Sequence, residues 1–331
     1  MDIETIVADS VKHNAGDLHL CGGYSPFWRC SGELIQREEY PLLSDQMLIS
    51  LSERWLTALQ REGLQREGQV DFVLSLADGT RLRGHFFYQR AGLSLALRVI
   101  PAIPPQPETL LLPAGYQQWL ALSHGLILVT GATGSGKSTT LAALIETLNC
   151  YHSRHIITLE DPIEFIHRNQ HALIQQRQIG EHCRSFAAGL RAALREDPDV
   201  ILLGELRDTE TIRLALTAAE TGHLVLATLH SRTASSAIDQ LVDVFNAEEK
   251  LLVRAQLAAS LQVVIAQRLV KALAGGRVAL YEVLINTPAV ANLIREGKCH
   301  QLPAQLQIGA QQGMQTFAQS EQRRREDGLI T

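Results

Sequence analysis

Short apolar runs recur four times in the second part of the chain, with longer amphipathic stretches between them. The runs lie at 126–129, 156–159, 200–203 and 224–227. Uninterrupted apolar runs of this length are typical of parallel strands that are buried on both faces. The stretches between them carry apolar residues at helical spacing, as at Phe186, Leu190 and Ala193. This alternation predicts an α/β fold with a doubly wound parallel sheet, whose ligands gather at the carboxyl ends of the strands.

The first 100 residues show a different pattern, in which apolar and polar positions alternate over short segments. An amphipathic helix is predicted over 3–11. Strands are predicted at 17–20, 27–30, 70–76, 81–87 and 93–99. Turns are predicted at Ser31-Gly32 and at Asp78-Gly79, and the second is a strong hairpin signal. We therefore expect a smaller α+β, PAS-like unit with mostly antiparallel strands over 1–100.

A proline-rich segment follows this unit. Four of the seven residues in 101–107 are prolines, so the segment cannot be helical and forms a stiff spacer. We predict a first domain over 1–100, a linker over 101–108 that acts as a hinge, and a second domain over 109–331.

The last hundred residues carry apolar positions at helical spacing. A capping box at 246–249 predicts a long helix that runs to about Leu269. Thr287-Pro288 predicts the start of another helix, which Gly297 ends. The polar end of the chain from about Gln311 is expected to be loosely held.

Composition excludes several classes of protein. The net charge of −5 gives no indication that nucleic acid or an acidic membrane surface is a partner. The five cysteines contain no C-x-x-C pair, which argues against a disulfide framework and a structural zinc site. The start lacks a basic segment followed by an apolar core, and no apolar run approaches the roughly 18 residues of a membrane span. A cytoplasmic location is therefore predicted.

A glycine-rich loop follows the first apolar run. Residues 131–140 read GATGSGKSTT and fit the pattern G-x-x-x-x-G-K-[ST] between a predicted strand and a predicted helix. Such a loop turns its N–H groups toward phosphates, whereas an ordinary Gly/Ser loop would not need this setting. Lys137 is expected to reach the β- and γ-phosphates, and the Ser138 hydroxyl to ligate Mg²⁺. The predicted phosphate-binding residues are Gly131, Thr133, Gly134, Ser135, Gly136, Lys137, Ser138 and Thr139.

Two carboxylates are candidates for the hydrolysis of a bound triphosphate. Glu205 follows the strand at 200–203 and is the candidate base that orients or deprotonates water. In the commonest arrangement an Asp precedes this Glu, but here Gly204 stands at that position. Glu164, beyond the end of the strand at 156–159, is the predicted second carboxylate, and a surface ion pair is the alternative. Glu160 and Asp161 nearby are expected only to cap or orient the loop.

Two histidines lie at the ends of the strand at 224–227. His230 leaves the strand at its carboxyl end and is the predicted sensor of the γ-phosphate, whereas His223 precedes the strand. Chance placement is the alternative, because the chain contains 12 histidines.

Four boxes in order resemble those of the ATPases that power type II secretion and type IV pili, and most closely the twitching-motility retraction ATPases of the PilT type. They are the glycine loop, EDPIEF at 160–165, the Walker B run at 197–208, and the histidine box at 221–230. The AGDLHL segment at 15–20 matches as well. The resemblance implies a RecA-like P-loop ATPase domain over 109–331, in which Glu205 and Glu164 match the catalytic carboxylates. It also matches Arg83 and Arg98 to two N-terminal arginines that approach the phosphates.

The resemblance further implies a hexameric ring that binds ATP and Mg²⁺ at the cytoplasmic face of the inner membrane. Its partner would be a platform protein of a pilus or secretion system, with no nucleic acid expected. Assembly and secretion ATPases usually carry a longer N-terminal extension and a four-cysteine zinc insert, neither of which is seen here. The segment 289–296 resembles the C-terminal helix motif of the retraction branch. It departs from that motif at Ala291, where the family usually has an arginine on what we expect to be an exposed helix face.

Several functions therefore stay open from the sequence. The favoured one is a retraction motor of a type IV pilus, and an assembly or type II secretion ATPase is the nearest alternative. A RecA-like nucleic-acid translocase would need a basic channel, against which the acidic net charge counts. A regulator or paralogue that binds ATP without motor activity is the non-enzymatic alternative.

Overall fold

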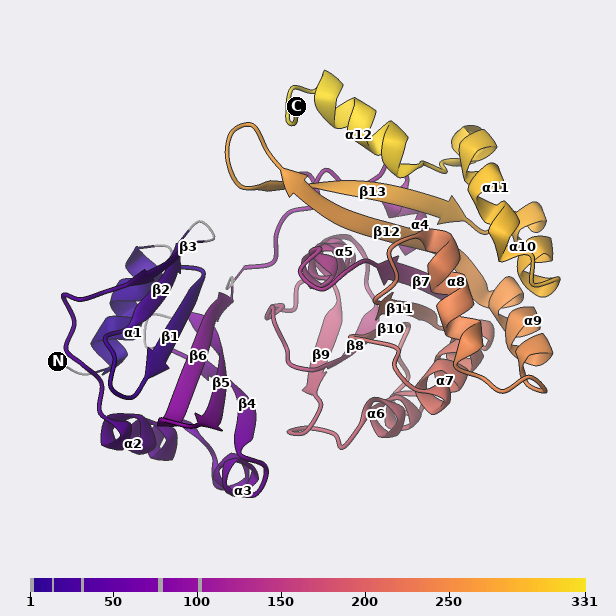
Figure 1. Ribbon diagram of the computed structural model, residues 1–331. Coiled ribbons are helices and arrows are strands. Elements are labelled where there is room, and N and C mark those ends of the chain that lie inside the picture. The colour runs from indigo at the N-terminus through magenta and orange to yellow at the C-terminus, as the bar shows by residue number, and fades with distance from the viewer. Residues whose placement is uncertain (1–2, 14, 31–32, 77–79, 101–102) are drawn as a thin grey trace. The chain divides into compact units, whose positions relative to one another are not determined.

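The computed structural model describes residues 3–13, 15–30, 33–76, 80–100 and 103–331. Contacts within the chain define two compact units, Met1–Ile103 and Pro104–Thr331 (Figure 1). Residues 103–106 carry no helix or strand, and residues 104–108 of the predicted linker belong to the second unit. Residues 101 and 102 of that linker lie outside the described residues.

The N-terminal unit is an antiparallel sheet with helices. Its strand order is β3-β2-β1-β6-β5-β4. The strands are β1 (Asp17–Cys21), β2 (Phe27–Cys30), β3 (Glu33–Gln36), β4 (Gln69–Ser75), β5 (Arg81–Gln89) and β6 (Gly92–Ile100). The helices are α1 (Ile3–Lys12), α2 (Asp45–Trp55) and α3 (Ala58–Glu67). The α+β prediction is confirmed, whereas its PAS-like character stays a prediction. The predicted turns at Ser31-Gly32 and Asp78-Gly79 lie outside the described residues.

The two faces of this sheet differ in chemistry. One face contributes Leu18, Leu95 and Phe86 to a buried core that includes α1 and α2. The other face carries polar side chains around an open cavity of about 320 Å³. Its lining includes Asp17, Arg29, Arg83, His85 and Arg98. Alternation along the strands separates these sets, because neighbouring residues of a strand point to opposite faces.

The C-terminal unit contains a seven-stranded sheet of order β13-β12-β7-β11-β10-β8-β9. Its strands are β7 (Gly125–Thr130), β8 (His155–Glu160), β9 (Leu173–Gln178), β10 (Val200–Leu203), β11 (Leu224–Leu229), β12 (Leu261–Lys271) and β13 (Arg277–Ile285). All neighbours pair in parallel except β12 and β13. The four predicted apolar strands form its centre, which confirms the parallel α/β fold, whereas β9, β12 and β13 were not predicted.

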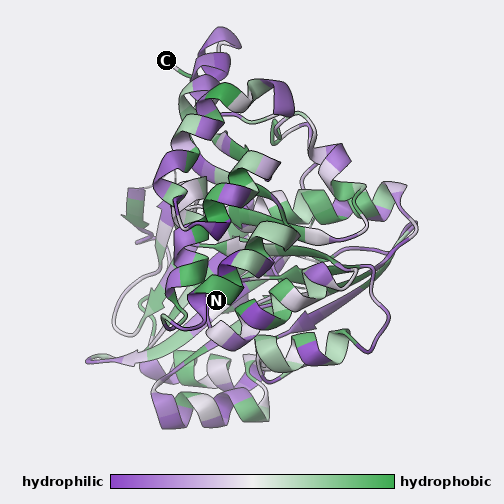
Figure 2. Cartoon of the chain, turned by 90° about the vertical axis from the view of Figure 1, so that its right-hand side faces the viewer, coloured by the Kyte–Doolittle hydropathy of each residue, from purple (hydrophilic) through white to green (hydrophobic). Residues whose placement is uncertain are grey.

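Helices cover both faces of the sheet. Leu126 and Leu128 of β7 belong to a core with α6 (Phe186–Ala193), α7 (Thr209–Glu220), α8 (Ala234–Asp243) and α9 (Lys250–Ser260). Ile127 and Val129 belong to a second core with α4 (Tyr116–Leu120) and α5 (Lys137–Tyr151). Figure 2 shows helices that change between green and purple along their length, as expected when a helix buries only one side.

The prediction of one long helix to about Leu269 is wrong. Helix α9 ends at Ser260, and β12 begins at Leu261 and pairs with β7. Val263, Val264 and Ile265 explain the change, because branched side chains favour strands and the edge of β7 offers an unpaired ladder. A short apolar run does not by itself distinguish a buried helix from a strand.

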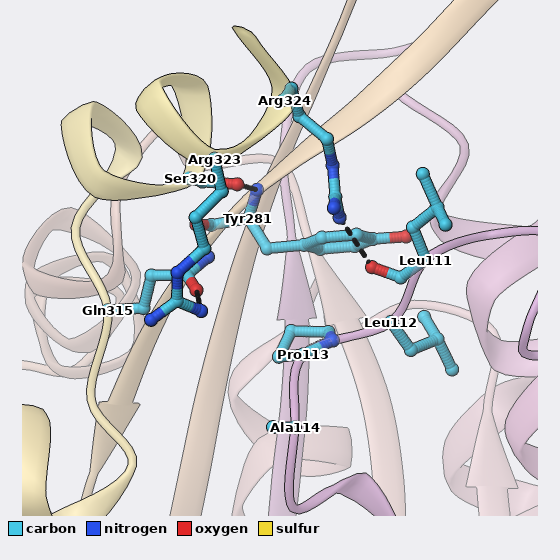
Figure 3. A pocket seen from close by; sticks show the side chains of 9 residues that line it. All are labelled: Leu111, Leu112, Pro113, Ala114, Tyr281, Gln315, Ser320, Arg323 and Arg324. Carbon is cyan, nitrogen blue, oxygen red and sulfur yellow. Dashed lines mark hydrogen bonds between the residues drawn. The ribbon is translucent and has the colours of Figure 1, made fainter. Parts of the chain in front are cut away.

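The C-terminal end is held, which overturns the expectation of a loose tail. Thr316 and Gln319 form a capping box at the start of α12 (Phe317–Glu326). Arg324 of this helix donates to the carbonyl of Leu111 at 2.7 Å, and Tyr281 of β13 donates its hydroxyl to the carbonyl of Leu110 at 3.0 Å. Leu111, Tyr281 and Arg324 line a cavity of about 190 Å³ (Figure 3). Helix α12 therefore ties the segment after the linker to β13.

Helix α10 (Pro288–Arg295) begins as predicted, with Thr287 capping Val290 N and proline in the first turn. Ala291 is only 8% exposed and packs in the core. The expectation that position 291 lies on an exposed face is wrong. Beyond α10 lie η1 (Cys299–Gln301), α11 (Leu302–Ile308) and η2 (Gly309–Gln312). In the part of the chain that the structure describes, every helix is too short or too polar to cross a lipid bilayer.

Tyr281→Phe tests the tie to the segment after the linker. Removing the hydroxyl leaves the Leu110 carbonyl without this partner, so we expect a loss of about 1 kcal/mol and a melting temperature lower by about 2–4 °C. Differential scanning fluorimetry measures the shift. Tyr151→Phe is the matched control, because Tyr151 is 78% exposed. Equal melting temperatures for both variants would contradict the assignment.

Candidate active site

The glycine loop joins the end of β7 to the start of α5. Every residue of β7 is buried, and the loop begins at its carboxyl end. Gly131, Gly134 and Gly136 have φ values of 155°, 76° and 89°. Residues that carry a side chain rarely adopt these backbone conformations, which explains why glycine occupies all three positions. The loop therefore reaches the helix N-terminus through turns that only glycine makes without strain.

The loop residues fit a bound phosphate chain. Ser135 Oγ is buried and has no hydrogen-bond partner among the described residues. A Cβ built on Gly134 would meet no atom within 4 Å, so the loop is open there. Ser138 and Thr139 lie in the first turn of α5, where helix N–H groups lack partners within the helix. A polar loop at a helix N-terminus with an unpaired hydroxyl is suited to an anionic ligand.

Lys137 is buried at the start of α5. Its Nζ donates to the carbonyls of Gly131 at 2.8 Å and Ala132 at 3.1 Å. Burial lowers the pKa of Lys137, and the nearby carboxylates of Glu205 and Glu164 oppose that change. A buried ammonium with two carbonyl partners can exchange these partners for phosphate oxygens, which are stronger acceptors because they are charged.

His230 and Glu205 meet beside this lysine. His230 Nδ1 is 3.4 Å from Lys137 Nζ, and its Nε2 is 2.9 Å from Glu205 Oε1. A neutral imidazole fits both contacts if Nδ1 accepts from the lysine and Nε2 donates to the carboxylate. The other carboxylate oxygen, Oε2, lies 2.6 Å from Arg207 Nη2. The structure thus brings together three predicted residues from the carboxyl ends of β7, β10 and β11.

Glu164 and Glu160 belong to the segment that follows β8. The carboxylate of Glu164 acts to raise the pKa of Lys137, so Glu164 lies within electrostatic range of the lysine. Glu160 accepts hydrogen bonds from Thr158 Oγ1 at 2.7 Å and Gln176 Nε2 at 3.1 Å. Burial raises the pKa of Glu160, against these hydrogen bonds. Glu160 therefore links the end of β8 to β9, whereas its predicted role of capping or orienting the loop stays a prediction.

Gly204 occupies the position where an Asp often precedes the catalytic Glu. A Cβ there would lie 3.2 Å from the carbonyl oxygen of Leu159 and 3.4 Å from Glu160 Cα. Close packing of β10 against β8 therefore explains the missing Asp. The described residues contain no cluster of three His, Cys, Asp or Glu side chains suited to a metal ion. A Mg²⁺ held by Ser138 and by phosphate oxygens needs no such cluster.

Arg83 and Arg98 lie apart from these residues in the chain, in the N-terminal unit. They face each other in register on β5 and β6, and Arg98 Nε is 2.6 Å from Asp17 Oδ1. Their approach to the phosphates stays a prediction.

His223 lies at the other end of β11 from His230 and contacts the carbonyl of Ala218 at 3.1 Å. His223 therefore lies at the end of β11 away from the glycine loop.

Gln267 of β12 contacts the glycine loop, and the sequence analysis missed it. Its Nε2 donates to the Ser135 carbonyl at 2.6 Å, and its Oε1 accepts from Thr140 Oγ1 at 2.8 Å. The side chain is 3% exposed. The available signal was a polar residue directly after the apolar run at 263–266, but that stretch was assigned to a helix.

Comparison with known proteins agrees with this geometry. The Type II/IV secretion system protein family matches residues 112–275. The chain is 58% identical over 330 residues to the uncharacterized protein YggR of Escherichia coli (strain K12), with 100% of both chains covered. It is 46% identical over 317 residues to the type IV pilus retraction ATPase PilT of Pseudomonas aeruginosa, covering 96% of this chain and 92% of PilT.

A solved structure has the same fold. The crystal structure of the pilus retraction motor PilT with bound ADP matches with a TM-score of 0.91 at 42% identity, covering 100% of this chain and 95% of that chain. The glycine loop and its surroundings define a P-loop protein of the α/β class. The chain belongs to the GspE/PilT-type secretion ATPases of the Type II/IV secretion system protein family. This confirms the resemblance drawn from the four boxes.

Gln267→Leu tests the contact between β12 and the loop. The substitution removes both hydrogen bonds and leaves the buried Ser135 carbonyl without this donor, so we expect affinity for ADP to fall by roughly tenfold. Titration with a fluorescent ADP measures the change. Gln262→Leu is the control, because Gln262 is on the same strand near the start of β7. Parental affinity in Gln267→Leu would show that the loop holds its shape without this residue.

Proposed function

We propose that this chain hydrolyses ATP with Mg²⁺ and that the reaction drives a type IV pilus motor. The observation that carries the proposal is the line of contacts from Lys137 through His230 to Glu205. This line supports the proposal, because it joins a cation suited to phosphate oxygens and a carboxylate suited to water at the edge of a parallel sheet where ligands gather.

Binding would use the loop and Lys137. The N–H groups of 131–139 surround the phosphates, and Lys137 exchanges its carbonyl partners for the β- and γ-phosphate oxygens. Ser138 would hold Mg²⁺, which when bound neutralises charge on the phosphates. The unpaired hydroxyl of Ser135 supports this assignment, because a buried polar atom without a partner is costly unless a ligand supplies one.

Glu205 is the proposed base. It orients the attacking water and accepts its proton. His230 senses the presence of the γ-phosphate through its contacts with both Glu205 and Lys137. Both oxygens of Glu205 have partners in this structure, His230 and Arg207. Arg207 is 63% exposed and can leave without a desolvation cost, which would free one oxygen for water. Glu164 is the proposed second carboxylate beside the phosphates.

The proposed motor is a hexameric ring at the cytoplasmic face of the inner membrane, acting on a platform protein of the pilus. Similarity along 92% of PilT supports retraction over assembly or type II secretion. Arg83 and Arg98 would supply positive charge to the phosphates during turnover. The alternative is an ATP-binding paralogue without a motor role.

Lys137→Ala and Glu205→Ala are expected to abolish phosphate release. The first removes the buried cation, and the second removes the group that orients water, so Glu205→Ala should keep its affinity for ADP. A coupled assay for inorganic phosphate measures turnover. Lys271→Ala and Glu326→Ala, at exposed positions, are matched controls. Near-normal release from either site variant would contradict the assignment.

Deletion of the gene in its host distinguishes the cellular roles. Loss of a retraction motor should leave cells with excess surface pili and without twitching, because filaments still form but are not withdrawn. Electron microscopy and a motility assay score the two properties. Bald cells would indicate an assembly ATPase, and unchanged cells would favour the paralogue.

A further inference from the structure

Glu164 lies in a segment without helix or strand. Residues 161–172 connect β8 to β9, and Ile163 and Phe165 on either side of Glu164 are buried. The backbone of a coil segment has no ladder to hold it, so the position of Glu164 depends on other contacts. Side chains of two neighbouring elements supply them.

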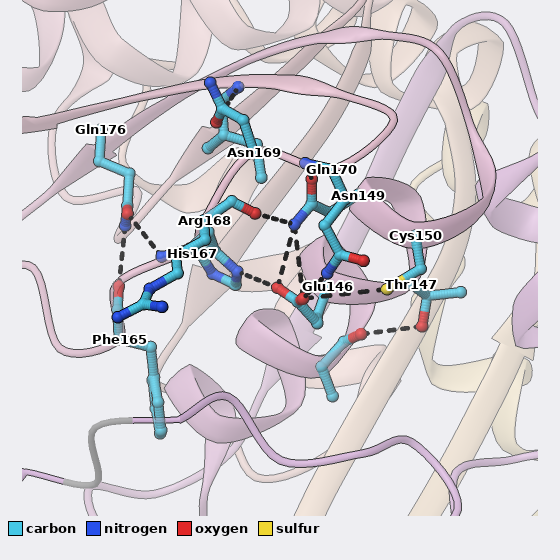
Figure 4. Close-up of polar contacts among 12 residues, drawn as sticks. Glu146, Thr147, Asn149, Cys150, Phe165, His167, Arg168, Asn169, Gln170 and Gln176 are labelled. Carbon is cyan, nitrogen blue, oxygen red and sulfur yellow. Dashed lines mark hydrogen bonds and ion pairs between the residues drawn. The ribbon is translucent and has the colours of Figure 1, made fainter.

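Two glutamines of β9 hold the segment on both sides of Glu164. Gln178 Oε1 accepts from Ile163 N at 3.1 Å. Gln176 Oε1 accepts from His167 N at 2.9 Å, and its Nε2 donates to the Phe165 carbonyl at 2.8 Å (Figure 4). Positions 176 and 178 share one face of the strand, because side chains alternate. We name these three hydrogen bonds the glutamine clamp.

The far end of the segment is anchored to α5. Glu146 accepts from His167 Nδ1 at 2.7 Å, and Asn149 donates to the Arg168 carbonyl at 2.7 Å. Both lie in the last turns of the helix whose first residue is Lys137. Figure 4 shows Glu146, Asn149 and His167 converging on this end of α5. One rigid helix thus carries the phosphate lysine at its start and holds the Glu164 segment at its end.

We propose that Gln176 and Gln178 are positioning residues that set the place of Glu164 for catalysis. The inference rests on the proposed ATP hydrolysis, in which Glu164 is the second carboxylate. The clamp acts on backbone groups at 163, 165 and 167, so it restricts Glu164 from both sides without contacting the phosphates itself. Gln176 also donates to Glu160, which links the clamp to the end of β8. Misplacing a catalytic group by about 1 Å can reduce turnover 100-fold, so such a clamp matters for rate more than for binding.

The test compares variants of the full-length chain for phosphate release, KM for ATP and affinity for fluorescent ADP. Gln178→Met keeps the volume but removes the acceptor, so kcat should fall by about tenfold or more while KM and ADP affinity stay within about threefold. Gln178 also donates to Glu181 at 3.0 Å, so the rescue variant is Gln178→Glu combined with Glu181→Gln. This pair keeps an oxygen for Ile163 N and a hydrogen bond between positions 178 and 181, and should restore kcat to within about threefold of the parent. Gln175→Met is the matched control, because Gln175 directly precedes Gln176 on the same strand, points to the opposite face and contacts His155 instead.

Three results would overturn the proposal. If Gln178→Met keeps the parental kcat while Glu164→Gln loses kcat, the proposed role of the glutamine clamp is rejected, but the proposed ATP hydrolysis is not. A parallel fall in kcat and ADP affinity, with no recovery in the Gln178→Glu, Glu181→Gln pair, would reduce the glutamines to a structural role. If both Glu164→Gln and Lys137→Ala release phosphate at the parental rate, the proposed ATP hydrolysis itself is rejected. If Gln178→Met does not fold, Gln176→Met tests the same clamp at Phe165 and His167.

Discussion

The glycine loop depends on two hydrogen bonds of Gln267, one that it donates to the Ser135 carbonyl and one that it accepts from the Thr140 hydroxyl. Three left-handed glycines make the loop possible, but flexible residues do not by themselves hold one shape. Gln267 brackets the loop on both sides of Gly136, and Tyr281, its partner in register on β13, reaches the Leu110 carbonyl. The loop, the β12–β13 hairpin and the segment after the linker therefore form one hydrogen-bonded unit.

The parallel sheet explains why chemistry from distant parts of the chain meets at one edge. Lys137, Glu205 and His230 each follow a different strand, and parallel strands end together. The contacts among them are short because β7, β11 and β10 are immediate neighbours. Glu164 follows β8, the next strand. Its segment continues beyond the sheet, so its position depends on the glutamine clamp.

The sequence predicted the elements whose signal was strong and local. Uninterrupted apolar runs identified the four central strands, and caps identified the start of α10. It failed where the pattern was ambiguous. The stretch at 261–270 forms β12 instead of a helix because the edge of β7 was available. In β9 only Leu173 and Ile174 are apolar before the polar run QQRQ, so no apolar run predicted that strand. The tail from Gln311 was misread because the partners of its arginines lie far away in the chain, as with Arg324 and Leu111.

The sequence by itself determined the family, the glycine loop and the order of the four boxes, because these depend on residue types at fixed local spacing. Only the tertiary structure decided that Gln267 holds the loop, that Ala291 is buried, and that Gln176 and Gln178 hold the Glu164 segment. Such contacts join elements that are distant in the chain. Their partners depend on how strands pair and helices pack, which no local pattern of residues specifies.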